Sequence, residues 1–203
     1  MKHRALILAC LLSVGSASTW AADIASSVKE RLLRPEVLRG EFEQSKQVNG
    51  FKKPLLSRGD FLVVNERGVV WRTREPFASV LKLTRDEIVA TQGNDVAFKL
   101  NASKEPSVRV INGLLFSLLN GDVSKLGEHF KIEGEANAKT WKLVLTSRQA
   151  ALAKLMSKVE LTGDQYVRRI DIDETNGDKT SIRFSAQNSE PAKLSREEAT
   201  RFD

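Results

Sequence analysis

The sequence is poor in the residues that build disulfides and metal sites. Its 203 residues include one cysteine, Cys10, and two histidines, His3 and His129. One thiol cannot form a disulfide within the chain, and two histidines cannot supply a histidine-rich metal site. The sequence also lacks G-x-S-x-G, H-E-x-x-H, paired-cysteine and phosphate-binding glycine motifs. It therefore predicts no metal, no cofactor and no catalytic residues, and it favours a protein that is not an enzyme.

Apolar runs that approach the length of a membrane span are absent outside the N-terminus. There, residues 1–4 are basic, residues 5–12 are apolar and residues 16–22 are mostly small. This order is typical of a cleaved secretory signal, and cleavage after Ala21 fits the small-residue rule because Thr19 then stands three positions back. The alternative, lipoprotein processing at Cys10, is disfavoured because the apolar run before that residue is short.

A cleaved signal at residues 1–21 leaves residues 22–203 as a single domain, an ordinary size for one hydrophobic core. Cleavage removes Lys2 and Arg4, so the formal net charge falls from +6 to +4, with 30 basic against 26 acidic residues. A mildly basic surface favours anionic partners such as phospholipid headgroups. Nucleic acid is not predicted as a partner, because an exported chain rarely meets it. The charged tail from about residue 188 is expected to be loosely held.

Alternating apolar residues between Gly50 and Leu83 predict three antiparallel strands, with a turn at residues 65–68 and a strand break at Pro76. The three strands share one broad apolar face that another part of the chain must cover. The residues on that face are Phe61, Val63, Trp71, Leu81 and Leu83.

The same alternation predicts further strands before and after this region, so the sheet is large. Asn176-Gly177 is the strongest hairpin signal in the sequence. One further strand is expected to begin near residue 38, before the ribbon. The others are expected after it, over residues 86–91, 96–100, 130–132, 141–145, 159–161, 166–173 and 182–184.

Three segments have helical rather than strand spacing. Residues 23–34 form an amphipathic pattern, with Ser27 and Glu30 as a capping box. Residues 149–156 are helical in composition. Residues 107–120 predict a strongly apolar helix, which is stable only when packed on the sheet and is therefore the natural cover for its apolar face. Periodicity alone does not distinguish a filled core from a cavity beneath this helix.

Two polar features are candidate catalytic sites. Asp171, Asp173, Glu174 and Asp178 gather near the Asn176 hairpin, where a solvated acidic turn is favoured over a carboxylate mechanism. His129 precedes the inward position of Phe130 and is expected on the surface.

The order of these segments resembles the LolA/LolB superfamily of periplasmic lipoprotein carriers. The resemblance is carried by the N-terminal helix, by GEFEQ at residues 40–44, by SRGDFLVVNERGVVWRTREPF at residues 57–77 and by the apolar helix in mid-chain. It implies a mainly β (α+β) fold: an incomplete antiparallel β-barrel with a helical lid over a hydrophobic cavity. It also implies a periplasmic location and a lipoprotein or other acylated amphiphile as cargo, taken from an inner-membrane donor and passed to an outer-membrane acceptor. The protein is expected to be a monomer.

On this resemblance, two sets of residues become candidate binding residues. The cavity would be lined by Phe42, Phe61, Val63, Trp71, Leu81, Leu83, Trp141, Leu143 and Leu145. The lid would contribute Ile111, Leu114, Leu115 and Leu118.

The sequence departs from the carriers in the turn of the central ribbon. Asn65 and Glu66 stand where the carriers have a basic residue and a proline, so the contact between arginine and lid is not expected here. A divergent branch with another amphiphile as cargo is the interpretation that follows. Lys52, Lys53 and Arg58 are candidates for contact with headgroups or a partner. The alternative function is a lipid-sensing or interaction module that acts on a membrane protein.

Overall fold

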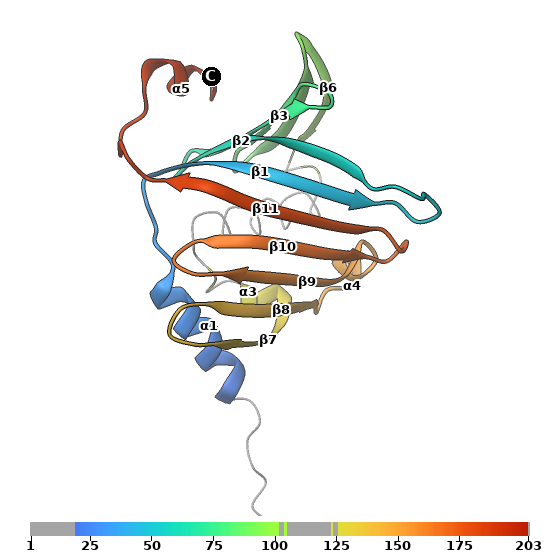
Figure 1. Ribbon diagram of the computed structural model, residues 1–203, viewed down its shortest axis with the longest axis vertical. Helices are drawn as coiled ribbons and strands as arrows, with labels where there is room; N and C mark the ends of the chain where they lie inside the picture. Colours follow the sequence, from blue (N-terminus) through green and yellow to red (C-terminus); the bar gives the residue numbers. More distant parts are fainter. Residues whose placement is uncertain (1–18, 102–103, 105–122, 124–125, 203) are drawn as a thin grey trace, which may run out of the picture.

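The fold is dominated by one antiparallel sheet of 11 strands (Figure 1). The computed structural model describes residues 19–101, 104, 123 and 126–202. The strands are β1 (Val37–Gln47), β2 (Leu55–Val64), β3 (Gly68–Glu75), β4 (Ser79–Leu83), β5 (Glu87–Gln92), β6 (Asp95–Asn101), β7 (Phe130–Ala136), β8 (Trp141–Ser147), β9 (Met156–Gly163), β10 (Val167–Glu174) and β11 (Lys179–Asn188).

The strand order is β6-β5-β4-β3-β2-β1-β11-β10-β9-β8-β7. Strands that follow one another in the chain are therefore neighbours, apart from β6 and β7. The pairing of β1 with β11 joins the two halves of the sheet. In the described part of the chain the sheet does not close, because β6 and β7 form its two edges. The predicted incomplete antiparallel β-barrel is thus confirmed.

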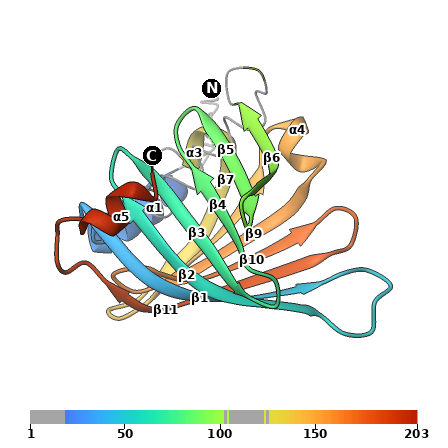
Figure 2. The ribbon, with the colours of Figure 1, turned by 90° about the horizontal axis from the view of Figure 1, so that it is seen from above.

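The sheet is curved (Figure 2), and its two faces carry different hydrophobic clusters. The face that we call the inner face carries the large hydrophobic cluster, which includes Phe42 and Phe61. The opposite, outer face carries a small cluster that includes Val37 and Leu62. Alternation along each strand sends neighbouring side chains to opposite faces, which is why the period-2 pattern of the sequence predicted the strands.

Three helices pack on the inner face near strands β7 to β9: α1 (Thr19–Arg31), α3 (Leu126–His129) and α4 (Ala150–Ala153). Each contributes a buried side chain to the inner cluster: Val28, Leu126 and Leu152. Figure 2 shows these helices on the concave side of the sheet. Among the described residues, no helix is long and apolar enough to cross a membrane.

Helix α1 begins and ends earlier than the predicted helix, which covers residues 23–34. Ser27 lies inside α1 and cannot be its N-cap, so the predicted capping box with Glu30 is wrong. The helix instead continues upstream to Thr19, across the expected cleavage point after Ala21. It is followed by Leu33, whose backbone N–H donates to the carbonyl of Gln165. The predicted helix over 107–120 lies outside the described residues.

The C-terminal tail crosses the outer face and ends in α5 (Arg196–Thr200). Leu194 and Phe202 pack against the outer cluster of Val37, Leu62, Val64 and Val70. Helix α5 has its own capping box, in which the hydroxyl of Ser195 accepts from the backbone of Glu198. We expected this tail to be loosely held, whereas the structure gives it apolar packing and the polar contacts of Arg39.

Arg39 on β1 ties the tail to the sheet. Its guanidinium donates to both carboxylate oxygens of Glu198, at 2.6 and 2.9 Å. It also donates to the carbonyls of Pro191, at 2.8 Å, and Lys193, at 3.1 Å. One arginine thus satisfies four acceptor atoms on three residues of the tail. Charge patterning could not predict this, because the partners lie about 150 residues further along the chain.

Candidate functional site

Two Gly-x-Phe segments pair across β1 and β2 and shape the centre of the inner face. Gly40 lies opposite Phe61, and Phe42 lies opposite Gly59. A Cβ atom on Gly40 would lie 2.5 Å from Cζ of Phe61, and one on Gly59 would lie 2.9 Å from Cε1 of Phe42. Each ring therefore lies over the opposite glycine, where any side chain would collide with it. This explains why both segments have glycine two positions before phenylalanine.

Four aromatic rings form a continuous apolar surface at this centre. Trp71 stacks on Phe42, with ring centroids 3.8 Å apart. Phe184 of β11 meets Phe61 edge-on at 5.4 Å and Trp71 at 5.9 Å. Offset-stacked and edge-on pairs are the favoured arrangements of aromatic side chains. Because β11 pairs with β1, a residue near the end of the chain completes the group.

The other half of the inner face repeats the glycine and aromatic pairing. Trp141 lies opposite Gly163, where a Cβ atom would be 2.5 Å from its indole ring. The indole N–H of Trp141 donates to the carbonyl of Asp164 at 2.6 Å, which satisfies the one polar atom of a buried side chain. Leu143 and Leu145 follow on the same face of β8 and are fully buried. The inner cluster therefore extends from β4 across to β8.

The predicted cavity residues come together on this face. All nine belong to, or pack against, the inner cluster. Trp71 and Leu81 are half-buried, and the others are buried. The residues are Phe42, Phe61, Val63, Trp71, Leu81, Leu83, Trp141, Leu143 and Leu145. The predicted lid residues Ile111, Leu114, Leu115 and Leu118 lie outside the described residues.

Several inner-face residues were missed as candidates. Phe184 and Ile170 are buried in the cluster, and Ile182 and Ile172 pack against it. The alternation of β10 and β11 was recognised in the sequence. The inward face could not be assigned, because that needs the long-range pairing of β1 with β11.

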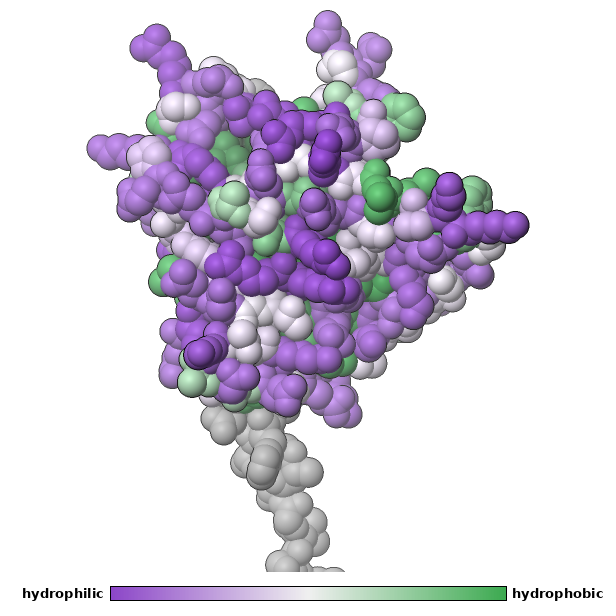
Figure 3. Space-filling model, in the orientation of Figure 1, coloured by the Kyte–Doolittle hydropathy of each residue, from purple (hydrophilic) through white to green (hydrophobic). Residues whose placement is uncertain are grey.

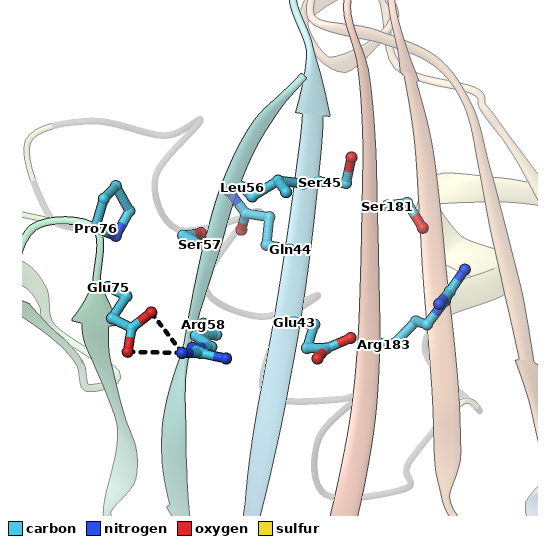
Figure 4. A pocket seen from close by; sticks show the side chains of 10 residues that line it. All are labelled: Glu43, Gln44, Ser45, Leu56, Ser57, Arg58, Glu75, Pro76, Ser181 and Arg183. Atoms are coloured by element: carbon cyan, nitrogen blue, oxygen red, sulfur yellow. Dashed lines mark hydrogen bonds and ion pairs between the residues drawn. The ribbon is translucent and has the colours of Figure 1, made fainter. Parts of the chain in front are cut away.

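A hollow of about 830 Å³ lies on the outer face (Figure 4). It is lined by Glu43, Gln44, Ser45, Leu56, Ser57, Arg58, Glu75, Pro76, Ser181 and Arg183. Glu43 pairs in register with both Arg58 and Arg183, and these positions point away from the inner cluster. Most of its lining residues are polar, so this hollow differs from the apolar cavity that was predicted.

The three predicted headgroup contacts have different surroundings. Arg58 forms an ion pair with Glu75 at 2.7 Å, and this contact raises the pKa of the arginine and lowers that of the glutamate. Lys52 and Lys53 are exposed in the connection between β1 and β2. Among the described residues, neither lysine forms an ion pair. The two lysines are therefore available to an outside partner, whereas the charge of Arg58 is offset by Glu75.

The acidic hairpin is a network of paired charges. Lys46 contacts Glu174 at 2.8 Å and Asp178 at 3.4 Å. Asp178 is 7% exposed, which differs from the expected solvated turn. The backbone N–H of Asn49 donates to its carboxylate and, with Lys46, lowers its pKa. A general acid needs a raised pKa, so this arrangement favours a structural role.

Residue His129 is half-buried at the end of α3 rather than fully exposed. Its Nδ1 lies 2.7 Å from Nε2 of Gln149. In the described part of the chain, no group of three or more histidine, cysteine, aspartate or glutamate residues could hold a metal ion.

Comparisons with known proteins agree with this architecture. The family described as "Outer membrane lipoprotein carrier protein LolA-like" matches residues 16–202. The outer-membrane lipoprotein carrier protein of Aeromonas salmonicida is 25% identical over 192 residues, covering 92% of this chain and 88% of that protein.

One solved structure shows a similar fold at low sequence identity. A DUF1329 family protein from Desulfovibrio piger has a TM-score of 0.51 at 11% identity, covering 90% of this chain and 95% of that chain. A LolA superfamily protein from Nitrosomonas europaea has a TM-score of 0.46 at 12% identity, covering 84% and 94%. Since the family match spans nearly the whole sequence, the chain belongs to the LolA-like family of outer membrane lipoprotein carrier proteins.

Proposed function

We propose that this protein is a periplasmic carrier that holds the acyl chains of a lipoprotein or another lipid against the inner face of its sheet and moves them toward the outer membrane. The observation that carries the proposal is the apolar cluster on the inner face, which extends from Leu81 on β4 to Leu145 on β8. Membership of a carrier family supports it. The binding surface would be the nine predicted cavity residues together with Phe184.

The half-buried members of the inner cluster are the expected points of contact. Trp71, Leu81 and Ile182 pack against the cluster without being fully buried. An acyl chain laid over them removes its methylenes from water, at about 0.8 kcal/mol each. A dozen methylenes would contribute about 10 kcal/mol, before the cost of ordering chain and protein is subtracted.

Release sets an upper limit on this affinity. A carrier without a nucleotide-driven step must let its cargo go, so the empty and loaded states should differ little in free energy. We propose that Ile111, Leu114, Leu115 and Leu118 form a lid that covers the apolar face when the cargo leaves. An inner-membrane donor and an outer-membrane acceptor would then set the direction of transfer.

A matched pair of substitutions on β4 tests the binding face. Leu81 and Val80 are neighbours and both are half-buried, but Leu81 packs on the inner cluster and Val80 on the outer one. We expect Leu81→Gln to weaken uptake of a fluorescent fatty acid at least tenfold, because it places an amide where the chain lies. Val80→Gln should change uptake by less than about twofold. Equal effects of the two substitutions, or none from Leu81→Gln, would contradict the proposal.

The alternative is an interaction module that acts on a membrane protein. A carrier takes up free acyl chains without any partner, whereas an interaction module needs no free apolar site. A purified wild-type protein that is folded and takes up no fatty acid would therefore favour the alternative.

A further inference from the structure

The strand connections at one end of the sheet form a distinct surface, which we call the hairpin end. Antiparallel pairing places four hairpins there: residues 48–54 between β1 and β2, 76–78 between β3 and β4, 93–94 between β5 and β6, and 175–178 between β10 and β11. The α4 connection joins them, because Thr175 bonds to the carbonyl of Leu155. The tail helix α5 and the turn between β2 and β3 lie at the opposite end.

Exposed apolar side chains concentrate at the hairpin end. Phe77 is 73% exposed, Leu56 65% and Phe51 64%. In the described part of the chain, all the large exposed hydrophobic residues except Leu33 and Phe98 lie within three residues of one of these connections. They are Phe51, Leu55, Leu56, Phe77, Val96 and Leu155. Figure 3 shows hydrophobic atoms beside hydrophilic tips over the projecting hairpin between β1 and β2.

Positive charge accompanies this apolar surface. Residues 48–54 read VNGFKKP, with two lysines and no acidic residue. Lys52 and Lys53 directly follow Phe51 and are exposed. The outer face is different, since Arg58, Arg72 and Arg74 all pair with carboxylates there. The positive charges of Lys52 and Lys53 at the tip of the hairpin are thus available to an anionic partner.

An aromatic side chain beside unpaired lysines matches the chemistry of a bilayer surface. Aromatic rings favour the boundary between headgroups and acyl chains, and lysines contact lipid phosphates. We propose that the hairpin end docks on an anionic phospholipid bilayer, with Phe51 and Phe77 entering the headgroup layer and Lys52 and Lys53 binding phosphate groups.

This docking surface leads into the inner face. Leu55 pairs with Lys46 in the register that continues the inner face of β2, and it is 58% exposed. Leu56 lines the outer hollow together with Pro76, which precedes Phe77. A docked molecule would therefore bring the hairpin end of the inner face close to the membrane. The proposal adds an interaction surface to the proposed carrier function, and membrane binding can be measured without measuring uptake.

Vesicle flotation of the full chain tests the docking. We expect the protein to float with vesicles of phosphatidylcholine containing phosphatidylglycerol, and to bind phosphatidylcholine vesicles at least tenfold less. Lys52→Glu and Lys53→Glu should each weaken binding by about fivefold or more, since a lysine near an anionic surface contributes about that factor. Lys139→Glu is the matched control, because Lys139 is equally exposed in the connection between β7 and β8 at the opposite end. It should leave binding within about twofold.

The apolar contribution needs its own pair of variants. Phe51→Ser should weaken binding even at raised salt, where the lysine contribution is screened. Leu33→Ser is its control at the opposite end, and it should have little effect. In Phe51→Trp, the new indole emission should shift to shorter wavelength on vesicles and be quenched by brominated lipids.

Three results would overturn the proposal. The first is a wild-type protein that does not float with anionic vesicles although it takes up fatty acid, which would leave the carrier function intact. The second is equal loss of binding from Lys52→Glu and Lys139→Glu. The third is a Phe51→Ser variant that keeps vesicle binding but changes oligomeric state or loses capture of a membrane protein, because the hairpin end would then contact a protein.

Discussion

Replacing Glu198 by glutamine should remove a defined part of the pH dependence of stability. Hydrogen bonds from Arg39, together with the backbone N–H of Ser195, lower the pKa of the Glu198 carboxyl from 4.5 to about 2. The carboxylate side chain is 16% exposed, so water screens this contact only partly. The ionised form is therefore held in the folded protein much more strongly than in the unfolded chain.

The size of the effect follows from linkage. A pKa difference of about 2.5 corresponds to an upper limit of about 3 kcal/mol in the free energy of unfolding. Because the folded pKa is lowered, this stabilisation is complete above the unfolded pKa near 4.5 and is lost as the pH falls towards 2. In Glu198→Gln the contribution is absent at every pH, although the amide oxygen can still accept one bond from Arg39.

Urea unfolding of the wild type, Glu198→Gln and Glu197→Gln at several pH values, from neutral to acid, measures this contribution to stability. We expect Glu198→Gln to be about 1 to 3 kcal/mol less stable than wild type at neutral pH, with the difference shrinking in acid. Glu197→Gln is the matched control on the same helix, since Glu197 is 80% exposed and its pair with Arg201 should contribute less than about 1 kcal/mol. If the wild type and Glu198→Gln lose stability in parallel as the pH falls, the tail is not held by this carboxylate.

Two other substitutions test how the inner face is packed. Gly59→Ala places a Cβ atom 1.8 Å from the carbonyl oxygen of Arg72 and should cost about 3 kcal/mol in urea unfolding. Gly127→Ala, where a Cβ meets nothing within 4 Å, should be close to neutral, and equal effects would refute the close approach. Trp141→Phe removes the hydrogen bond to Asp164 and should lower the free energy of unfolding by about 1 to 2 kcal/mol. An unchanged midpoint in the same urea assay would show that this bond contributes nothing.

Local patterns in the sequence were enough to predict most strands. The ribbon from Gly50 to Leu83 became β2, β3 and β4 because alternation and turn chemistry agree there. The Asn176-Gly177 hairpin formed as expected, with Gly177 at a φ of +90° that glycine adopts without strain. The nine predicted cavity residues belong to, or pack against, one cluster, since strand register fixes which side chains share a face. Their role as the lining of a cavity stays a prediction.

Features that depend on long-range pairing were not predictable. The N-terminus of helix α1 was misplaced because Ser27 and Glu30 match a capping motif, whereas the helix already begins upstream at Thr19. The contribution of Phe184 required the pairing of β11 with β1. The contact of Arg39 with Glu198 joins residues 159 positions apart. The last two depend on how distant parts of the chain come together rather than on a local pattern.

Native mass spectrometry of the protein released gently from the periplasm tests the central claim most directly. If the inner face carries acyl chains, the intact mass should exceed the mass of the chain by that of a lipid or acylated molecule. Unfolding should release this molecule, and Leu81→Gln should carry less of it than Val80→Gln. A protein that is folded and has only the mass of its own chain in all three forms would contradict the account.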